Sequence, residues 1–281
     1  MTTSPASSGK LPLSSLPPAS GRAGLSGAVR SEWTKIRSVR STYWTLIALL
    51  VVSIGLDALI SAASASHLNN QPGDKVGFDS TQVSLFAFVA LGQLILAVLG
   101  GMTITAEYST GMIRTSLSAQ PRRGIIYAAK AAVFGAVALV ICFITSFVAF
   151  FLGQALLSST GISTTLSQPE VLRAVVGSAL VVTLVGMFAF GLGAIFRHTA
   201  ATIATSIGVM FVVPIIINLL PDNWRQDIVR WLPSSAIDRI SATLPGANPH
   251  MFGPWGQFAV TAAWAVAAVA VGAFLFRKRD A

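Results

Sequence analysis

Residues 83–105 read VSLFAFVALGQLILAVLGGMTIT, an apolar run without a single charged side chain. A helix needs about 20 apolar residues to cross the roughly 30 Å of hydrocarbon in a bilayer, so this run is long enough to span a membrane. Five other runs meet the same criterion, at 44–62, 131–157, 174–196, 199–220 and 254–276. The sequence therefore predicts an all-α, polytopic integral membrane protein with one six-helix transmembrane domain over 44–281.

The composition indicates that lipid is the solvent of this chain. Of its 281 residues, 53% are hydrophobic and only 10% are charged, whereas a soluble domain carries about 25% charged residues. The mean hydropathy is +0.71. These values exclude a water-soluble globule, and so apolar a chain is not disordered over its whole length. The single cysteine, Cys142, cannot form an intrachain disulfide and is expected to be a small buried side chain.

The first run carries two unusual features. Asp57 is the only acid inside a predicted span, and an ionisable residue within a membrane is a candidate functional group. Its position, one turn from the outer edge, would let the carboxylate reach water. Ala63 and Ala65 imitate the A-x-A pattern of a signal-peptide cleavage site. The segment before the run is far too long for a signal peptide, so we expect an uncleaved span.

The basic residues gather in alternate loops. The segments that precede the first run, follow the second, join the fourth to the fifth and follow the sixth together hold 14 of the 19 Lys and Arg residues. Because cytoplasmic loops are the more basic ones, both termini are predicted to be cytoplasmic, in a multi-pass protein of the cell membrane. The net charge of +9 is distributed between apolar runs, which favours anionic membrane lipids over nucleic acid as partners.

Catalytic signatures are absent from the sequence. It has no G-x-x-x-x-G-K-[ST] motif for nucleotide phosphates and no H-E-x-x-H motif for zinc. Its histidines, His67, His198 and His250, fall in separate predicted loops. We therefore expect no catalytic residue, no metal site and no ATP hydrolysis by this chain alone.

The N-terminal region divides into a tail and a helix. Residues 1–28 are rich in Ser, Pro, Gly and Ala, which predicts a disordered cytoplasmic tail. Over 29–43, the stretch SEWTKIRSVR places Trp33 on the apolar face of a helix, with Lys35 and Arg37 on its flanks. This pattern suits a helix that lies in the headgroup layer just before the first span.

The loop after the second run is the most distinctive cytoplasmic segment. Residues 106–117 read AEYSTGMIRTSL, and at helical spacing Glu107, Gly111 and Arg114 share one face. This arrangement suits a short element that lies on the membrane or against a partner. An ordinary interfacial loop, whose basic side chains reach the headgroups, explains the same residues.

Helix packing can be anticipated at a few positions. Pro214 removes a main-chain hydrogen bond and is expected to kink the fifth span. The segment 222–239 carries apolar residues at helical spacing, which suits an interfacial helix on the outer side. Small residues four apart favour close helix contacts and form two stripes, at Ala200, Ala204 and Gly208 and at Ala259, Ala263 and Ala267.

These segments together resemble the permease subunits of ABC-2 ATP-binding-cassette transporters. The resemblance rests on the six spans and on four stretches, SEWTKIRSVRSTYW at 31–44, TAEYSTGMIRTSLSAQPRR at 105–123, AAKAA at 128–132 and FRKRDA at 276–281. It covers nearly everything after residue 29. It implies an ABC-2, type V exporter-like architecture in which an interfacial connecting helix leads into the first span.

The resemblance also implies partners and residue roles. Two permease copies, identical or paralogous, would pair with two separately encoded ATPase subunits, which bind the ATP and Mg²⁺. The connecting helix would contribute Glu32, Trp33, Lys35 and Arg37. The ATPase-coupling loop would comprise Glu107, Tyr108, Ser109, Thr110, Gly111, Arg114, Arg122 and Arg123. A second cytoplasmic contact would lie at Arg197 and His198, and the substrate path would include Gln93, Thr103 and Asn218.

The expected function is export, and the sequence does not identify the substrate: it favours a lipid-like or amphipathic molecule and leaves a drug, a lipid, a peptide and a polysaccharide open. A small inorganic ion is a poorer fit, because ion sites need fixed charges or rings of oxygen ligands within the membrane. Two other functions explain a polytopic chain. One is an integral-membrane enzyme, which would need clustered acid, His or Ser side chains at one depth. The other is a membrane anchor or assembly factor that transports nothing.

Overall fold

The computed structural model describes residues 24–112, 122–244 and 250–278, which fold into helices and short connections. Six segments within these residues are long and apolar enough to cross a membrane, which confirms the predicted fold class. They are α2 (Arg40–Asn70), α3 (Ser80–Ser109), α5 (Arg123–Leu157), α6 (Pro169–Phe196), the α7–α8 segment and α11 (Pro254–Lys278). All but the α7–α8 segment extend beyond the predicted runs, because the helices continue into the polar residues that flank the hydrocarbon layer.

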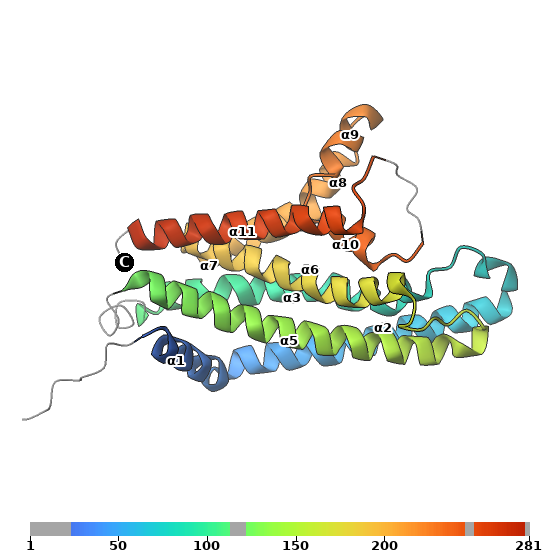
Figure 1. The fold of residues 1–281 in the computed structure, drawn as a ribbon, viewed down its shortest axis with the longest axis horizontal. Helices are drawn as coiled ribbons and strands as arrows, with labels where there is room; N and C mark the ends of the chain where they lie inside the picture. Colours follow the sequence, from blue (N-terminus) through green and yellow to red (C-terminus); the bar gives the residue numbers. More distant parts are fainter. Residues whose placement is uncertain (1–23, 113–121, 245–249, 279–281) are drawn as a thin grey trace, which may run out of the picture.

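The two ends of the molecule differ in what they carry (Figure 1). At one end lie the N-terminal helix α1 (Leu25–Ser38), the end of α3, the start of α5, the α6–α7 turn and the end of α11. We call it the basic end, since it holds the segments predicted to be cytoplasmic. The opposite end carries the short helices η2 (Pro72–Lys75) and η3 (Ser158–Thr160), whereas α9 (Asp222–Val229) and α10 (Ser235–Ser241) lie away from the basic end but nearer the middle of the molecule's length.

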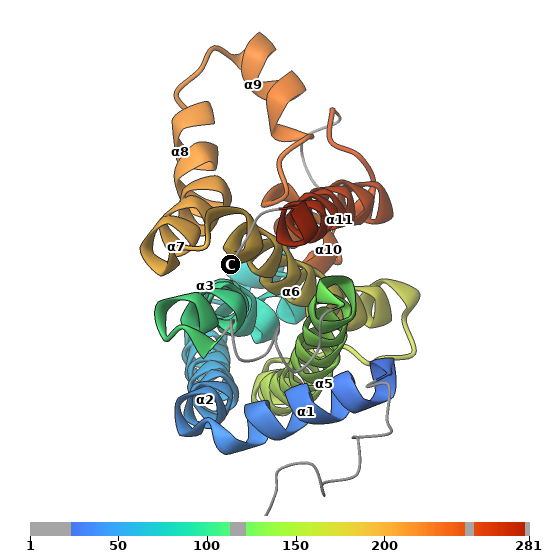
Figure 2. The same ribbon diagram turned by 90° about the vertical axis from the view of Figure 1, so that its left-hand side faces the viewer.

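Helix α1 differs in its bounds from the predicted 29–43. It begins at Leu25, so residues 25–28 are helical and not part of a disordered tail, whereas residues 1–23 lie outside the described part of the chain. It ends at Ser38, because Val39 is extended, with φ −83° and ψ 101°. This break turns the chain, and Figure 2 shows α1 lying across the ends of α2 and α5.

Helix α6 is the centre of the bundle, with α3, α5 and α11 around it (Figure 2). Glycines allow its closest contacts. A Cβ atom on Gly100 of α3 would lie 2.2 Å from the carbonyl oxygen of Gly186, and one on Gly191 would lie 2.4 Å from the carbonyl carbon of Ala268 in α11. Helix backbones approach this closely only where the side chain is absent. The glycines therefore set the spacing of α3, α6 and α11.

The two predicted small-residue stripes do not form these contacts. The alanines of both stripes are exposed, and a Cβ atom on Gly208 would meet nothing within 4 Å. The prediction was wrong for contacts within this chain, because the spacing of small residues does not say which face of a helix meets a neighbour. Within the described residues, the glycines that approach the backbone of another helix most closely lie in α3, α6 and α11, and Gly153 of α5 packs tightly against the Ser84 side chain of α3.

The fifth span is interrupted, as Pro214 predicts. Helix α7 (Thr199–Ile207) passes into a π-helical turn, η4 (Gly208–Val212), before α8 (Val213–Ile217). Proline lacks the N–H that would continue the α-helical ladder, and here a single π turn, a rare feature that occurs mostly inside α-helices, comes just before it. Both figures show α8 and α9 projecting away from the other spans. The predicted outer helix over 222–239 is present as two separate short helices, α9 and α10.

Asp57 does not reach water, in contrast to the prediction. Its exposed fraction is 0%. One carboxylate oxygen accepts a hydrogen bond from the Ala87 N–H at 2.7 Å, and the other accepts one from the Phe88 N–H at 3.0 Å. Both donors lie in α3, so the acid attaches α2 to α3. The distance of Asp57 from the end of the apolar run did not predict its exposure to water, because the side chain faces a neighbouring helix.

Candidate functional site

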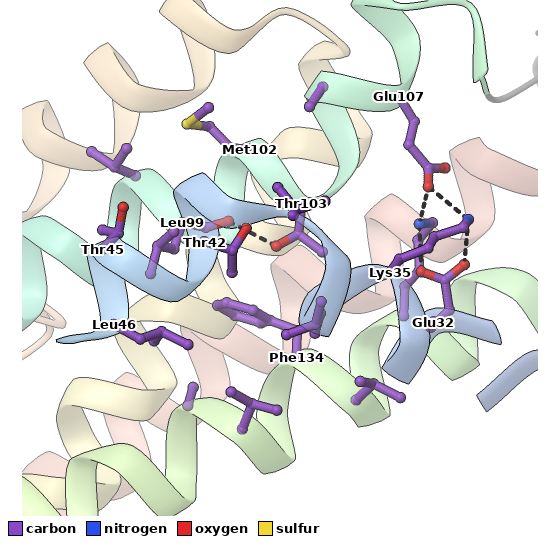
Figure 3. A pocket seen from close by; sticks show the side chains of 18 of the residues that line it. Glu32, Lys35, Thr42, Thr45, Leu46, Leu99, Met102, Thr103, Glu107 and Phe134 are labelled. Atoms are coloured by element: carbon purple, nitrogen blue, oxygen red, sulfur yellow. Dashed lines mark hydrogen bonds and ion pairs between the residues drawn. The ribbon is translucent and has the colours of Figure 1, made fainter. Parts of the chain in front are cut away.

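Four charged side chains meet at the basic end and form what we call the ion cluster. Glu32 and Lys35 come from α1, Glu107 from the end of α3 and Lys130 from the first turns of α5. Lys130 Nζ lies 2.7 Å from Glu32 Oε2 and 2.5 Å from Glu107 Oε1. Lys35 Nζ lies 2.8 Å from Glu32 Oε1 and 2.9 Å from the same Glu107 oxygen (Figure 3).

The ion cluster is buried and electrically balanced. Only 2% of the Lys130 side chain is exposed, compared with 29% of Lys35. Two acids and two bases cancel, which is the condition under which buried charges are tolerated. Removing one member of a buried ion pair typically costs about 3–5 kcal/mol, because its partner is left uncompensated. The cluster therefore attaches α1 firmly to α3 and α5.

Lys35 stays charged in this setting. Burial by itself would lower the pKa of Lys35, but hydrogen bonds and negative charge from Glu32 and Glu107 outweigh it and raise the pKa above the usual 10.5. Glu32 and Lys35 face the protein, whereas Trp33 and Arg37 are exposed on the other side of α1. The predicted connecting helix therefore divides into an inward charged face and an outward face.

The predicted coupling loop begins as part of α3. The helix runs to Ser109, and the hydroxyls of Ser109 and Thr110 both donate to the carbonyl of Ala106. Gly111 ends the turn with φ +71°, a backbone angle that favours glycine. The spacing had predicted that Glu107, Gly111 and Arg114 share one helical face. Glu107 and Gly111 do not, because the helix ends between them, and Arg114 lies outside the described residues.

The second predicted cytoplasmic contact lies beside the first. The Arg197 guanidinium lies 4.8 Å from the centre of the Tyr108 ring, and Thr199 Oγ1 donates to Thr105 Oγ1 at 2.9 Å. Arg197 ends α6 with φ +56°, and His198 Nδ1 accepts a hydrogen bond from the main chain of α7. These contacts join the end of α3 to the α6–α7 turn.

The three predicted path residues lie apart. The Gln93 amide is buried and donates to the carbonyl of Val89 in its own helix. Asn218 is exposed at the end of α8, the helix that projects away from the other spans. Thr103 borders a cavity between α1, α2, α3 and α5 that also touches the ion cluster (Figure 3). A single copy of the chain thus does not assemble them into one path.

A family model described as "ABC-2 family transporter protein" matches residues 28–221. This range covers more than half of the 281 residues. The chain belongs to the ABC-2 transporter family. It is therefore a membrane component of a transporter, from a family that is typically non-catalytic. A search of curated proteins finds none that matches.

The matched range gives the ion cluster its context. All four of its residues lie inside the ABC-2 match, whereas α9, α10 and α11 lie beyond it. Lys130 was the member that the sequence analysis missed, although a lysine within the apolar stretch AAKAA signals a buried partner. Across the described ranges, no three His, Cys, Asp or Glu side chains are grouped as metal ligands.

Proposed function

We propose that this ABC-2 chain is the permease subunit of an exporter in the cell membrane, driven by separate ATPase subunits that bind ATP and Mg²⁺. The observation that carries the proposal is the ion cluster. It links the helix before the first span to the cytoplasmic ends of two other spans, beside the segment that the resemblance assigns to the ATPase. A displacement of the basic end would therefore be transmitted to the spans through short, buried ion pairs.

The docking surface would combine both predicted cytoplasmic contacts. Ser109, Thr110 and Arg122 are exposed on either side of the segment 113–121. The contact between Tyr108 and Arg197 places the α6–α7 turn next to them. Glu107 is buried in the ion cluster, so in this proposal it positions the coupling loop and does not itself contact the ATPase.

Nucleotide would act by shifting a conformational equilibrium. ATP binding at the ATPase can favour an outward-open arrangement of the permease only to the extent that the ATPase binds the two arrangements with different affinities. In this proposal, the chain converts that difference in affinity into a change in the arrangement of its spans. The buried charges suit this role, because they resist being pulled apart.

A second permease copy would complete the substrate path. The fifth span is the least covered part of the bundle together with α2, and Ile215 and Ile216 of α8 are exposed. The exposed stripe of Ala200 and Ala204 would allow a second helix to approach α7 closely. The path would then lie between two copies, and its apolar walls favour a lipid-like or amphipathic substrate.

Recruitment of an ATPase tests the proposal. The chain is co-expressed with ABC ATPase subunits from the same genome, and membrane recruitment and ATP turnover are measured with Arg122→Glu, alone and combined with Arg114→Ala. We expect both readouts to fall, because the docking surface loses or reverses its charge. Arg225→Glu in α9, away from the basic end, makes the same charge change and should leave both readouts unchanged.

The outcomes separate the alternatives. Normal recruitment and turnover with both docking variants would reject the proposed surface. If no ATPase from the genome co-purifies with the unmodified chain, the proposed coupling to a separate ATPase fails.

A further inference from the structure

The outer half of the fifth span stands apart from the other spans. Past the π-helical turn η4, α8 makes its main contacts with η4 and α9, the elements next to it in the chain. Ile215 of α8 is 63% exposed, and no residue of α9 is buried. Figures 1 and 2 show α8 and α9, which we call the arm, projecting from the side of the molecule. A segment with so few packed side chains can move without opening the core.

The inner half of the same span is fixed to the bundle. The Thr202 side chain of α7 packs so closely on α3 that a Cβ atom on Gly101 would lie 2.8 Å from it. Met210, within η4, is only 3% exposed and belongs to a hydrophobic cluster with Phe188 of α6 and Ala265 of α11. The fifth span is therefore held as far as Met210, and the arm begins just beyond it.

The chain is fixed again where the arm returns to the bundle. Trp264 Nε1 donates to the carbonyl of Trp231 at 3.1 Å, and Thr261 Oγ1 donates to the carbonyl of Pro233 at 2.7 Å. Both donors lie on α11. The arm is thus attached at its two ends only, and a segment held in this way can turn about the line that joins its attachments.

Polar interactions do not tie the arm to the bundle. Its ion pairs, Asp222 with Arg225 and Asp227 with Arg230, are local to α9 and the residue that caps it. The structure describes all of residues 213–228, and no hydrogen bond or ion pair joins their side chains to the described part of the bundle. A movement of the arm would consequently break no buried polar contact, in contrast to a movement at the ion cluster.

The backbone is weakened where the arm leaves the bundle. The π turn η4 ends at Val212, and Pro214 follows within the first turn of α8. Proline removes a main-chain hydrogen bond of the helix, and sharp bends in helices occur mainly at prolines and π turns. Single π turns are also frequent at functional sites. These features are typical of a hinge.

We propose that the arm swings about η4 and the connection that follows α9, and that in the transporter it is the outer gate of the substrate path. The swing is a property of a single chain. Its role as a gate rests on the function proposed above, in which the path runs beside the fifth span and the substrate leaves on the outer side. The arm lies at the outer end of that span, where an exit would be opened or closed.

Distances between spin labels test the swing on the full chain without any ATPase. Labels are placed on Ile216→Cys in the arm and Val266→Cys in α11, both exposed positions, in a Cys142→Ala background. The labelled protein is diluted with unlabelled chain in nanodiscs, so that each measured pair lies within one copy. We expect a distance distribution at least about twice as wide as that of Val140→Cys with Val266→Cys, a pair within the bundle.

Three variants locate the hinge. Pro214→Ala restores the missing N–H, so the distribution between the labels at 216 and 266 should narrow toward that of the pair within the bundle. Met210→Ala removes the side chain that fixes η4, so the same distribution should widen. Pro169→Ala makes the first change at the start of α6, where a proline replaces no helical hydrogen bond, and should leave the width unchanged.

Nucleotide tests the role as a gate. In the complex with its ATPase, ATP should shift the mean distance between the labels at 216 and 266 and leave the distance between those at 140 and 266 unchanged. If the arm swings in the isolated chain but does not respond to ATP, it is not the gate. If no ATPase binds the chain, the gate is rejected together with the proposed function, whereas the result on the swing stands.

Two results would overturn the swing itself. A distribution no wider than that of the pair within the bundle would show that the arm is fixed, whether by a second copy or by its own packing. A wide distribution that Pro214→Ala leaves unchanged would show that the movement does not arise at η4.

Discussion

Replacing Lys130 with methionine would leave two buried carboxylates facing one lysine. Lys130 Nζ lies 2.7 Å from Glu32 and 2.5 Å from Glu107, and 2% of its side chain is exposed. Methionine has a similar length but no charge, so it fills the space without replacing the ion pairs. We expect Lys130→Met to lower the free energy of unfolding by about 3–5 kcal/mol, the usual cost of leaving a buried charge unpaired.

Cys142 provides the assay. It is the only cysteine in the sequence and has an exposed fraction of 0% in the middle of α5. A thiol reagent reaches it only when the bundle opens, so its labelling rate in nanodiscs reports the population of the open state. A loss of about 3–5 kcal/mol corresponds to an increase in that rate of about 150- to 5000-fold.

A second substitution tests the cause. In Lys130→Met combined with Glu107→Gln, one acid and one base are lost together, and the Glu32–Lys35 pair remains balanced. We expect the double variant to recover much of the lost stability. Lys278→Met, which removes an exposed lysine at the same end, should label like the unmodified chain.

Two results would refute this reasoning. If Lys130→Met labels Cys142 no faster than Lys278→Met, the ion cluster does not hold the bundle together. If the double variant is less stable than Lys130→Met alone, the defect comes from lost packing or hydrogen bonds and not from unbalanced charge.

Three further predictions concern stability, each measured by the same thiol labelling. Gly100→Ala would place a Cβ atom 2.2 Å from backbone of α6 and should cost about 1–3 kcal/mol or more, whereas Gly208→Ala meets nothing within 4 Å and should be nearly neutral. Gln257→Leu should stabilise the protein by about 1–3 kcal/mol, because the side-chain amide oxygen and nitrogen of Gln257 are both buried without a partner among the described residues. Gln154→Leu loses hydrogen bonds to Ser80 and Ser84 and should destabilise the protein. The pKa of Lys35 is raised in the folded protein, so the contribution of Lys35 to stability is complete below its unfolded-state pKa near 10.5. That contribution disappears as the pH rises through the higher folded-state pKa. A loss of stability between neutral pH and about pH 9 would contradict this assignment.

The spans were predictable because their signal is local. An uncharged run of sufficient length identifies a span without reference to any other part of the chain, and Pro214 acts on its own helix. The basic loops likewise predicted which segments would gather at one end.

The pairings were not predictable, because they depend on how the helices are rotated. Lys130 lies 98 residues from Glu32 and 23 from Glu107 along the chain, and no spacing rule connects them. The same limit explains Asp57, which is buried against the main chain of α3. It also explains the small-residue stripes, where the correct residue types lie on faces that this chain leaves uncovered.

The glycine contacts between α3, α6 and α11 have a mechanical consequence. Side chains normally separate the backbones of neighbouring helices and can change rotamer when the helices slide, but at Gly100 and Gly191 the backbones of these three helices meet without one. The three helices should therefore move as one rigid body, with little sliding of one helix along another. The cavity lies where α1, α2 and α5 face α3, so relative movement within one subunit is expected between this trio and those three helices.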